Sequence, residues 1–191
     1  MRCDAAGFAA FAALLAECRE VFNRKLLDYG PVWLVFRRVS LADQVFIKLC
    51  RLRSLEEAPE SRRVEDTPRD EYIGIVNYCI MALMKEEGGL PPPQDVLENP
   101  RLLESLPLAD ILRSYDGAAA RAGELLERKN HDYGEAWKDM DVRSITDQML
   151  VKILRIKHML SSRREMAKAD SLPAQFMDIL NYSLFSLCIT G

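Results

Sequence analysis

Apolar residues recur at helical spacing through most of the chain. Phe8, Phe11, Leu15, Cys18 and Phe22 lie alternately three and four residues apart, the pattern of an amphipathic helix that we expect to run to about residue 28. Two stretches, 73–84 and 172–189, are apolar almost all round, and helices of that kind must be buried on most sides. Because no stretch alternates at period two, the pattern predicts an all-α fold.

Punctuating residues predict where these helices begin and end. Gly30 and Pro31 form a stop signal, because glycine accepts the left-handed cap and proline cannot continue a helix. Ser40 and Ser144 are each followed three residues later by Asp, as in a capping box, and predict helices to about residues 57 and 166. Residues 59–69 read as irregular, and a third helix is predicted over 70–86. The glycines and prolines after residue 87 open a linker.

The chain spells one motif twice. Lys-x-x-Asp-Tyr-Gly-x-x-Trp, followed by Ser-x-x-Asp-Gln-x-x-x-Lys-x-x-Arg, begins at Lys25 and again at Lys129. The offset of 104 residues still holds at Asn77-Tyr78 and Asn181-Tyr182. The chain is therefore an internal duplication whose period is that of a small domain rather than of a solenoid repeat.

The duplication predicts the architecture. Residues 1–87 form repeat one, 88–106 a Gly/Pro-rich linker and 107–191 repeat two, with three helices in each repeat. Neither repeat can hide its apolar third helix alone, so we expect the two to pack as one globular unit. The prediction is a six-helix bundle with a pseudo-two-fold axis.

The composition limits the classes of binding partner that we expect. The chain of 191 residues is 49% hydrophobic and 29% charged, with a net charge of −3 and a pI near 5.5. A nucleic-acid polymer or an anionic membrane would require a dominant basic face, so neither is expected as the main partner. A small anion held by a few Lys and Arg side chains stays compatible with this balance.

The cysteines and the N-terminus indicate a cytoplasmic protein. The five cysteines form no Cys-x-x-Cys pair and are expected to be free thiols in a reducing compartment. The two histidines lack metal-site spacing, which argues against zinc. The apolar residues near the N-terminus are periodic and interrupted by acids, unlike those of a signal peptide or a membrane span.

The repeated cations are the first candidate site. Lys48 and Arg51 lie three residues apart, with Gln44 one turn earlier, so the three share a helix face. Repeat two preserves this set as Gln148, Lys152 and Arg155. Two cations and an amide suit a phosphate or a carboxylate; the alternative is a solvated face.

Other repeated residues have both structural and functional interpretations. Asp43 and Asp147 either cap helices or contact a metal or ligand. A buried Asn77 or Asn181 must find a partner, in the fold or in a ligand. The aromatic side chains stack on a base or plug the core, and the residues in the last helical turns are further ligand candidates. The aromatic candidates are Tyr29, Trp33, Tyr133 and Trp137, and the candidates in the last helical turns are Lys25, Asp28, Lys129 and Asp132.

The third helices suggest a divided metal site. Repeat one reads Glu71-x-x-Gly74, whereas repeat two reads Gln175-x-x-Asp178, so each repeat retains one carboxylate. Two acids at i and i+3 can clamp a magnesium ion that bridges phosphates. Either Glu71 and Asp178 form one composite site together, with Asp43 and Asp147 as further ligands, or metal chemistry has been lost.

The paired motifs resemble the nucleotide modification associated domain, type one, a bacterial and phage family. The resemblance covers residues 17–187 and includes a tandem arrangement; it implies an association with nucleotides and no established reaction. A more distant resemblance is to the all-α nucleoside triphosphate pyrophosphohydrolases of the MazG and dimeric dUTPase kind. Those enzymes hold magnesium with Glu-x-x-Glu and Glu-x-x-Asp pairs. The first pair is absent here except for Asp43, and the second is split between the repeats.

Three functions follow from these patterns. The first is a nucleotide-binding protein that acts as a magnesium-dependent pyrophosphohydrolase on a modified nucleotide. The second is a non-catalytic module that binds a nucleotide or other phosphorylated anion. The third is a structural bundle with a buried polar network. The sequence leaves open the base, the sugar, the number of sites and whether two chains form a homodimer.

Overall fold

A computed structural model describes residues 5–61, 63, 65–162 and 171–191. Within these residues every regular element is helical and no strand occurs, so the predicted all-α class is confirmed. The six long helices are α1 (Ala5–Tyr29), α2 (Arg38–Glu57), α3 (Pro68–Glu87), α6 (Leu108–Tyr133), α7 (Val142–Ser162) and α8 (Leu172–Thr190). The short elements are η1 (Val32–Val35), η2 (Pro59–Ser61), α4 (Pro93–Glu98), α5 (Leu102–Ser105) and η3 (Ala136–Asp139).

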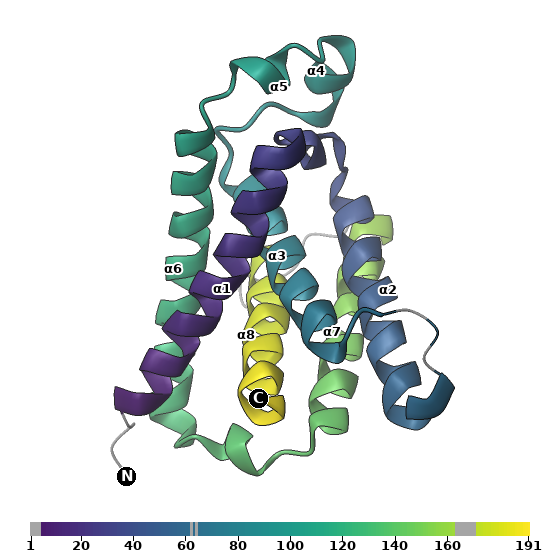
Figure 1. Cartoon of the computed structure of the whole chain (residues 1–191), viewed down its shortest axis with the longest axis vertical. Coiled ribbons are helices and arrows are strands. Elements are labelled where there is room, and N and C mark those ends of the chain that lie inside the picture. Colours follow the sequence, from purple (N-terminus) through teal and green to yellow (C-terminus); the bar gives the residue numbers. More distant parts are fainter. Residues whose placement is uncertain (1–4, 62, 64, 163–170) are drawn as a thin grey trace.

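The six long helices are arranged with pseudo-two-fold symmetry. Each helix packs on its own counterpart from the other repeat: α1 on α6, α2 on α7 and α3 on α8. Contacts between α3 and α6 are matched by contacts between α8 and α1. Figure 1 shows α1 beside α6, with α8 running between the other helices. The bundle from two repeats is thus confirmed, and the repeats are intertwined.

The third helix of each repeat lies at the centre, as its composition predicts. Buried side chains of α3 and α8 belong to one hydrophobic cluster that takes residues from all six long helices. Apolar surface on every side of a helix is stabilised only when neighbours cover it all round, and the opposite repeat supplies that cover. None of the helices described here has the length and apolarity needed to cross a bilayer.

The helix ends match the stop signals but not the caps. α1 ends before Gly30 (φ +70°) and α6 before Gly134 (φ +61°), both in the left-handed region that glycine tolerates. The prediction that Ser40 and Ser144 are N-caps is wrong, because α2 begins at Arg38 and α7 at Val142. The backbone N–H of Arg143 instead donates to Asp141 (2.9 Å). The predicted end of α7 near residue 166 lies outside the described residues.

The segment expected to be a linker contains structure of its own. It holds the short helices α4 and α5. Val96 on α4 is buried, and α4 packs against η1 of repeat one. The segment therefore covers the end of the bundle at which α1 turns into η1, as Figure 1 shows.

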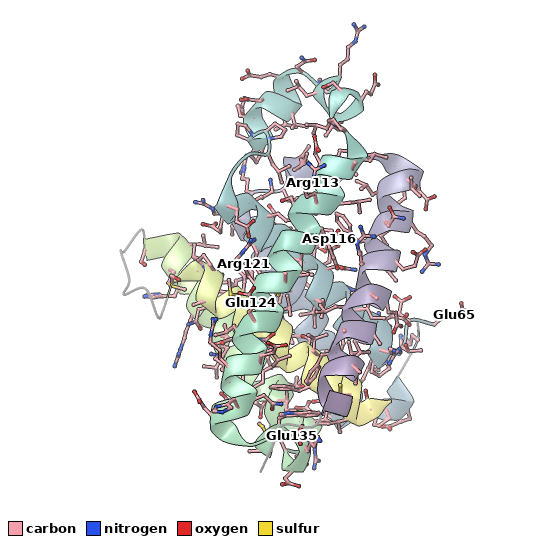
Figure 2. All side chains as sticks on the ribbon, turned by 90° about the vertical axis from the view of Figure 1, so that its left-hand side faces the viewer. Glu65, Arg113, Asp116, Arg121, Glu124 and Glu135 are labelled. Carbon is pink, nitrogen blue, oxygen red and sulfur yellow. The ribbon has the colours of Figure 1, made fainter. Side chains whose placement is uncertain are left out.

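Exposed ion pairs line the surface of α6. Figure 2 shows Arg113, Asp116 and Arg121 along this helix. Asp116 accepts from Arg19 on α1 (Nη2–Oδ2, 3.0 Å), and Arg121 pairs with Glu87 on α3. Pairs of this exposure contribute roughly 0–1 kcal/mol each. The buried apolar contacts therefore account for most of the stability of the bundle.

The cysteines differ sharply in environment, which gives a first testable prediction. Burial raises the pKa of Cys18 to about 12 and raises that of Cys79 further, whereas Cys50 is exposed. Because the thiolate is the reactive form, an aromatic disulfide reagent at pH 8 should modify Cys50 rapidly in the native protein. Cys18 and Cys79 should react only on unfolding, and peptide mass mapping would check this. Native-state labelling of Cys18 at the rate of Cys50 would contradict the burial.

Candidate functional site

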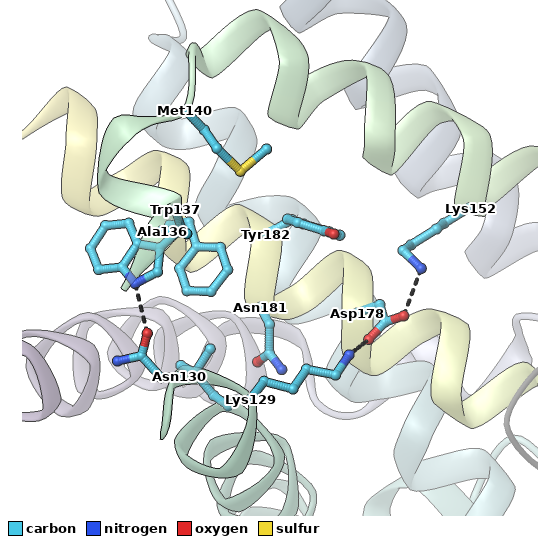
Figure 3. Close-up of a pocket in the computed structure, with 11 residues that line it drawn as sticks. Lys129, Asn130, Ala136, Trp137, Met140, Lys152, Asp178, Asn181 and Tyr182 are labelled. Atoms are coloured by element: carbon cyan, nitrogen blue, oxygen red, sulfur yellow. Dashed lines mark hydrogen bonds and ion pairs between the residues drawn. The ribbon is translucent and has the colours of Figure 1, made fainter. Parts of the chain in front are cut away.

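A pocket of about 390 Å³ opens in repeat two between α6, η3, α7 and α8. Its charged residues meet at Asp178 on α8, which pairs with Lys152 (2.6 Å) and with Lys129. Figure 3 shows the Asp178 carboxylate between the two ammonium groups. Two cations share one carboxylate, so the described lining carries an excess of positive charge.

Aromatic side chains form the opposite wall of this pocket. Trp137 of η3 stacks on Phe185 of α8, with ring centroids 4.8 Å apart and an interplanar angle of 5°. The indole N–H of Trp137 donates to Asn130 (3.0 Å), which fixes the ring orientation. Lys152 lies over the ring of Tyr182, 5.9 Å from its centroid. The pocket therefore places two lysines beside flat apolar surfaces.

Asn181 brings unsatisfied hydrogen-bonding groups to the pocket. Its side chain lines the pocket and is 3% exposed, yet neither its nitrogen nor its oxygen has a partner among the described residues. Its counterpart Asn77 donates to the carbonyl of Cys18 (3.0 Å) and accepts from the hydroxyl of Tyr115 (2.7 Å). The two asparagines, alike in sequence, thus differ in the structure.

Repeat one contains the equivalent pocket, with a volume of about 720 Å³. Each of the eleven residues that line the pocket of repeat two has its counterpart, 104 positions earlier, in the lining of this one. Among these pairs are Lys25 and Lys129, Trp33 and Trp137, Lys48 and Lys152, Asn77 and Asn181, and Tyr78 and Tyr182. The duplication has therefore preserved a pocket as well as a fold.

The carboxylate of repeat one lies one helical turn from the position used in repeat two. Glu71 is buried and pairs with Lys48 (2.9 Å) and with Arg51, which also contacts Asp66 (3.2 Å). Lys48 reaches Glu71 by crossing Gly74, where an added Cβ would lie 2.6 Å from Lys48 Cε. In repeat two Asp178 occupies that position and takes the lysine directly. Burial, and the nearby Glu71 carboxylate, raise the pKa of Tyr78.

The structure separates the remaining predicted ligand residues. Arg51 pairs with Glu71, and Arg155 is exposed. Neither Gln44 nor Gln148 lines the two pockets, and neither do the exposed Asp28 and Asp132. Tyr29 is exposed at the rim of the repeat-one pocket, while both tryptophans are buried. The side chain of Tyr133 lies outside the described residues.

Asp43 and Asp147 have a role that the sequence did not suggest. Asp43 on α2 pairs with Lys157 on α7, and Asp147 on α7 lies 3.6 Å from Arg53 on α2. Arg53 and Lys157 are counterparts at the same offset of 104. The repeated aspartates therefore form one ion pair twice, across the contact between α2 and α7, and they do not cap helices.

The carboxylates do not assemble the ligand set that magnesium requires. Glu71 and Asp178 lie in different pockets, each paired with lysine, and Asp43 and Asp147 lie at the contact between α2 and α7. Within the described part of the chain no three Asp, Glu, His or Cys side chains gather as metal ligands. The described residues do not fit a magnesium-bridged phosphate.

Several residues that shape the pockets were not predicted from the sequence. Tyr78 and Tyr182 repeat beside the asparagines and line both pockets, so their repetition was an available signal. Asn130 and Phe185 have no identical counterpart, and no repeat could have drawn attention to them. Where Asn130 holds Trp137, repeat one has Leu26, and the buried indole N–H of Trp33 has no partner among the described residues.

One comparison with known proteins gives a match. The family model for nucleotide modification associated domain 1 matches the chain twice, over residues 25–85 and 129–189. No curated protein and no solved structure gives a significant match. Each matched segment lies within one repeat, and the two together exceed half of the chain. They include the pocket residues other than Val21, Phe22 and Arg24 in repeat one and Leu126 in repeat two. This chain belongs to the nucleotide modification associated domain 1 family, in a tandem form.

Proposed function

We propose that this protein binds a nucleotide, or a closely related phosphorylated aromatic compound, in the pockets of its repeats. The observation that carries the proposal is that the two pockets correspond position for position, with two lysines, a tryptophan, an asparagine and a tyrosine identical in both repeats. Lysine is a point charge suited to phosphate, and flat aromatic walls suit a planar base. A pocket of about 390 Å³ lies in the size range of small-molecule sites. The family association with nucleotides supports the same ligand class.

The proposed role is binding and includes no metal-dependent hydrolysis. Glu71 and Asp178 are paired with lysine and arginine, and no three potential metal ligands gather among the described residues. An incoming phosphate would compete with Asp178 for Lys129 and Lys152. The lysines would then turn from the carboxylate toward the ligand, and binding would be sensitive to salt.

The test is a binding titration without magnesium. Lys48→Ala combined with Lys152→Ala removes the repeated lysine from both pockets, and a charge-assisted contact contributes about 1.5–3 kcal/mol. We expect the affinity for nucleoside mono- or triphosphates, measured by calorimetry, to fall by about tenfold or more. Arg113→Ala, which removes an exposed cation that pairs with Asp110 and lines neither pocket, is the control and should not change affinity. Retained affinity in the double variant would exclude these pockets.

A further inference from the structure

The unmet hydrogen bonds of Asn181 distinguish the two pockets. A buried carboxamide without partners is unfavourable, because its donor and acceptor have lost water and gained nothing. Asn77 avoids this state through Cys18 and Tyr115. Asn181 does not, although it lines a pocket large enough to admit a ligand. A ligand that offers both an acceptor and a donor would supply what the described fold does not.

The missing partner has a traceable cause. Tyr115 on α6 serves Asn77 on α3, and its counterpart 104 positions earlier is Phe11 on α1. Phe11 lies at the equivalent place, with its ring 5.5 Å from Trp137 and 5.8 Å from Phe185, two walls of the pocket. Phenylalanine has no hydroxyl. Repeat one therefore satisfies its asparagine with a side chain from the other repeat, and repeat two leaves its asparagine available.

Charge distinguishes the pockets in the same direction. The described lining of the repeat-one pocket holds three cations and three carboxylates, so they balance: Arg24, Lys25 and Lys48 with Asp66, Asp70 and Glu71. Among the described residues that line the repeat-two pocket, Lys129 and Lys152 are balanced by Asp178 alone. An anion is attracted to the second pocket, whereas the first has no excess positive charge for it.

Among the described residues of repeat one, the indole N–H of Trp33 is the one buried side-chain polar group without a partner. A single donor is satisfied by any one acceptor, a water molecule included. The Asn181 carboxamide presents a donor and an acceptor side by side, and one planar edge of complementary pattern satisfies both at once. Trp33 therefore specifies no particular ligand, whereas Asn181 selects for a ligand that carries an acceptor and a donor side by side on one planar edge.

We propose that the repeat-two pocket is the recognition site, that it holds one nucleotide per chain, and that Asn181 pairs with the edge of the base. This inference rests on the proposed nucleotide-binding function. Nucleobases carry adjacent donors and acceptors, and asparagine pairs with such an edge in adenine through two hydrogen bonds. Asp178, Asn181 and Tyr182 share one face of α8, being three and four residues apart. The base and the phosphate would thus be held from the same helix, with the phosphate toward Lys129 and Lys152.

Calorimetric titration of the full chain tests this assignment. The ligands are the four common nucleoside monophosphates and ribose 5-phosphate, which has the phosphate and sugar but no base. We expect at least one nucleotide to bind at one site per chain. The affinity for ribose 5-phosphate should be lower by about tenfold or more. Asn181→Leu should reduce the affinity for that nucleotide by about tenfold and leave the affinity for ribose 5-phosphate unchanged.

Two further variants complete the design. Arg143→Ala removes an exposed cation that pairs with Asp141 and lines neither pocket, so it should bind the nucleotide as the unmodified chain does. Phe11→Tyr supplies the hydroxyl that Tyr115 gives to Asn77, and should weaken nucleotide binding by competing for Asn181. It decides the question if Asn181→Leu does not fold.

The outcomes separate the two levels of the proposal. Nucleotide binding that is unaffected by both Asn181→Leu and Phe11→Tyr would overturn the role of Asn181 while the proposed function stands. Two equivalent sites per chain would overturn the assignment to repeat two. Absence of binding by every nucleotide would overturn the proposed function itself, and this inference with it.

Discussion

Replacing Glu71 by alanine should lower the free energy of unfolding by about 3 kcal/mol or more. Glu71 is the buried acid of repeat one, with a side chain 3% exposed, and it holds both Lys48 and Arg51. Without it Lys48 loses its carboxylate and Arg51 retains the exposed Asp66 (3.2 Å), while both cations are only about one-quarter exposed. Breaking a buried pair from one side costs more than the pair itself contributes. Chemical denaturation followed by circular dichroism measures the change.

An exposed ion pair provides the matched control. Glu17 pairs with Arg69 (2.6 Å), and both side chains are more than one-third exposed. Glu17→Ala should therefore change stability by no more than about 1 kcal/mol. Equal effects of the two substitutions would show that burial does not set the contribution of Glu71.

Repeat two suggests a rescue. Glu71→Gln combined with Gly74→Asp gives repeat one the residues that repeat two carries at Gln175 and Asp178. The new side chain would displace the flexible end of Lys48, which now lies against Gly74, and would pair with it as Asp178 pairs with Lys152 (2.6 Å). This double variant should be more stable than Glu71→Gln alone. A double variant less stable than the single one would show that the two arrangements are not interchangeable.

The second large effect is the contrast in the free energy of unfolding when each of the two asparagines is replaced by leucine. Asn77→Leu should lower the free energy of unfolding by about 2 kcal/mol or more, because it leaves the carbonyl of Cys18 and the hydroxyl of Tyr115 without their partner. Burial raises the pKa of Tyr115, so this hydroxyl keeps its proton and must still donate it. Asn181→Leu removes two unpaired polar atoms and strands no described group. It should leave stability unchanged or increase it.

Thermal and chemical denaturation of both variants, in the absence of ligand, would check this contrast. Tyr115→Phe is the control for Asn77, because it removes the same hydrogen bond from the opposite side. It should destabilise the protein by a smaller amount than Asn77→Leu. Equal destabilisation by Leu at positions 77 and 181 would mean that Asn181 is satisfied within the folded chain, and the case for a ligand there would fall.

The pocket could be predicted only in part. Lys48 and Lys152 were identified because they repeat, and the structure does place both in pockets. Asp43 and Asp147 also repeat, but they form ion pairs between α2 and α7 and line neither pocket. A repeated polar residue indicates a preserved interaction without saying whether the partner is a ligand or the other repeat. That distinction requires knowing which residues face each other across the pseudo-two-fold axis.

The duplication, the all-α class and the helix stops at Gly30 and Gly134 were determined by the sequence itself, because local backbone preferences and helical periodicity act within a few residues. The fate of the asparagines was decided by tertiary structure. Asn77 and Asn181 have the same neighbour, Tyr78 and Tyr182, in equivalent helices. What separates them is Tyr115 against Phe11, residues of α6 and α1 that meet the third helices only when the repeats intertwine. Buried hydrogen bonds depend on atoms brought together from distant parts of the chain. Only the packed bundle therefore shows which asparagine has partners within the fold and which has hydrogen-bonding groups left for a ligand.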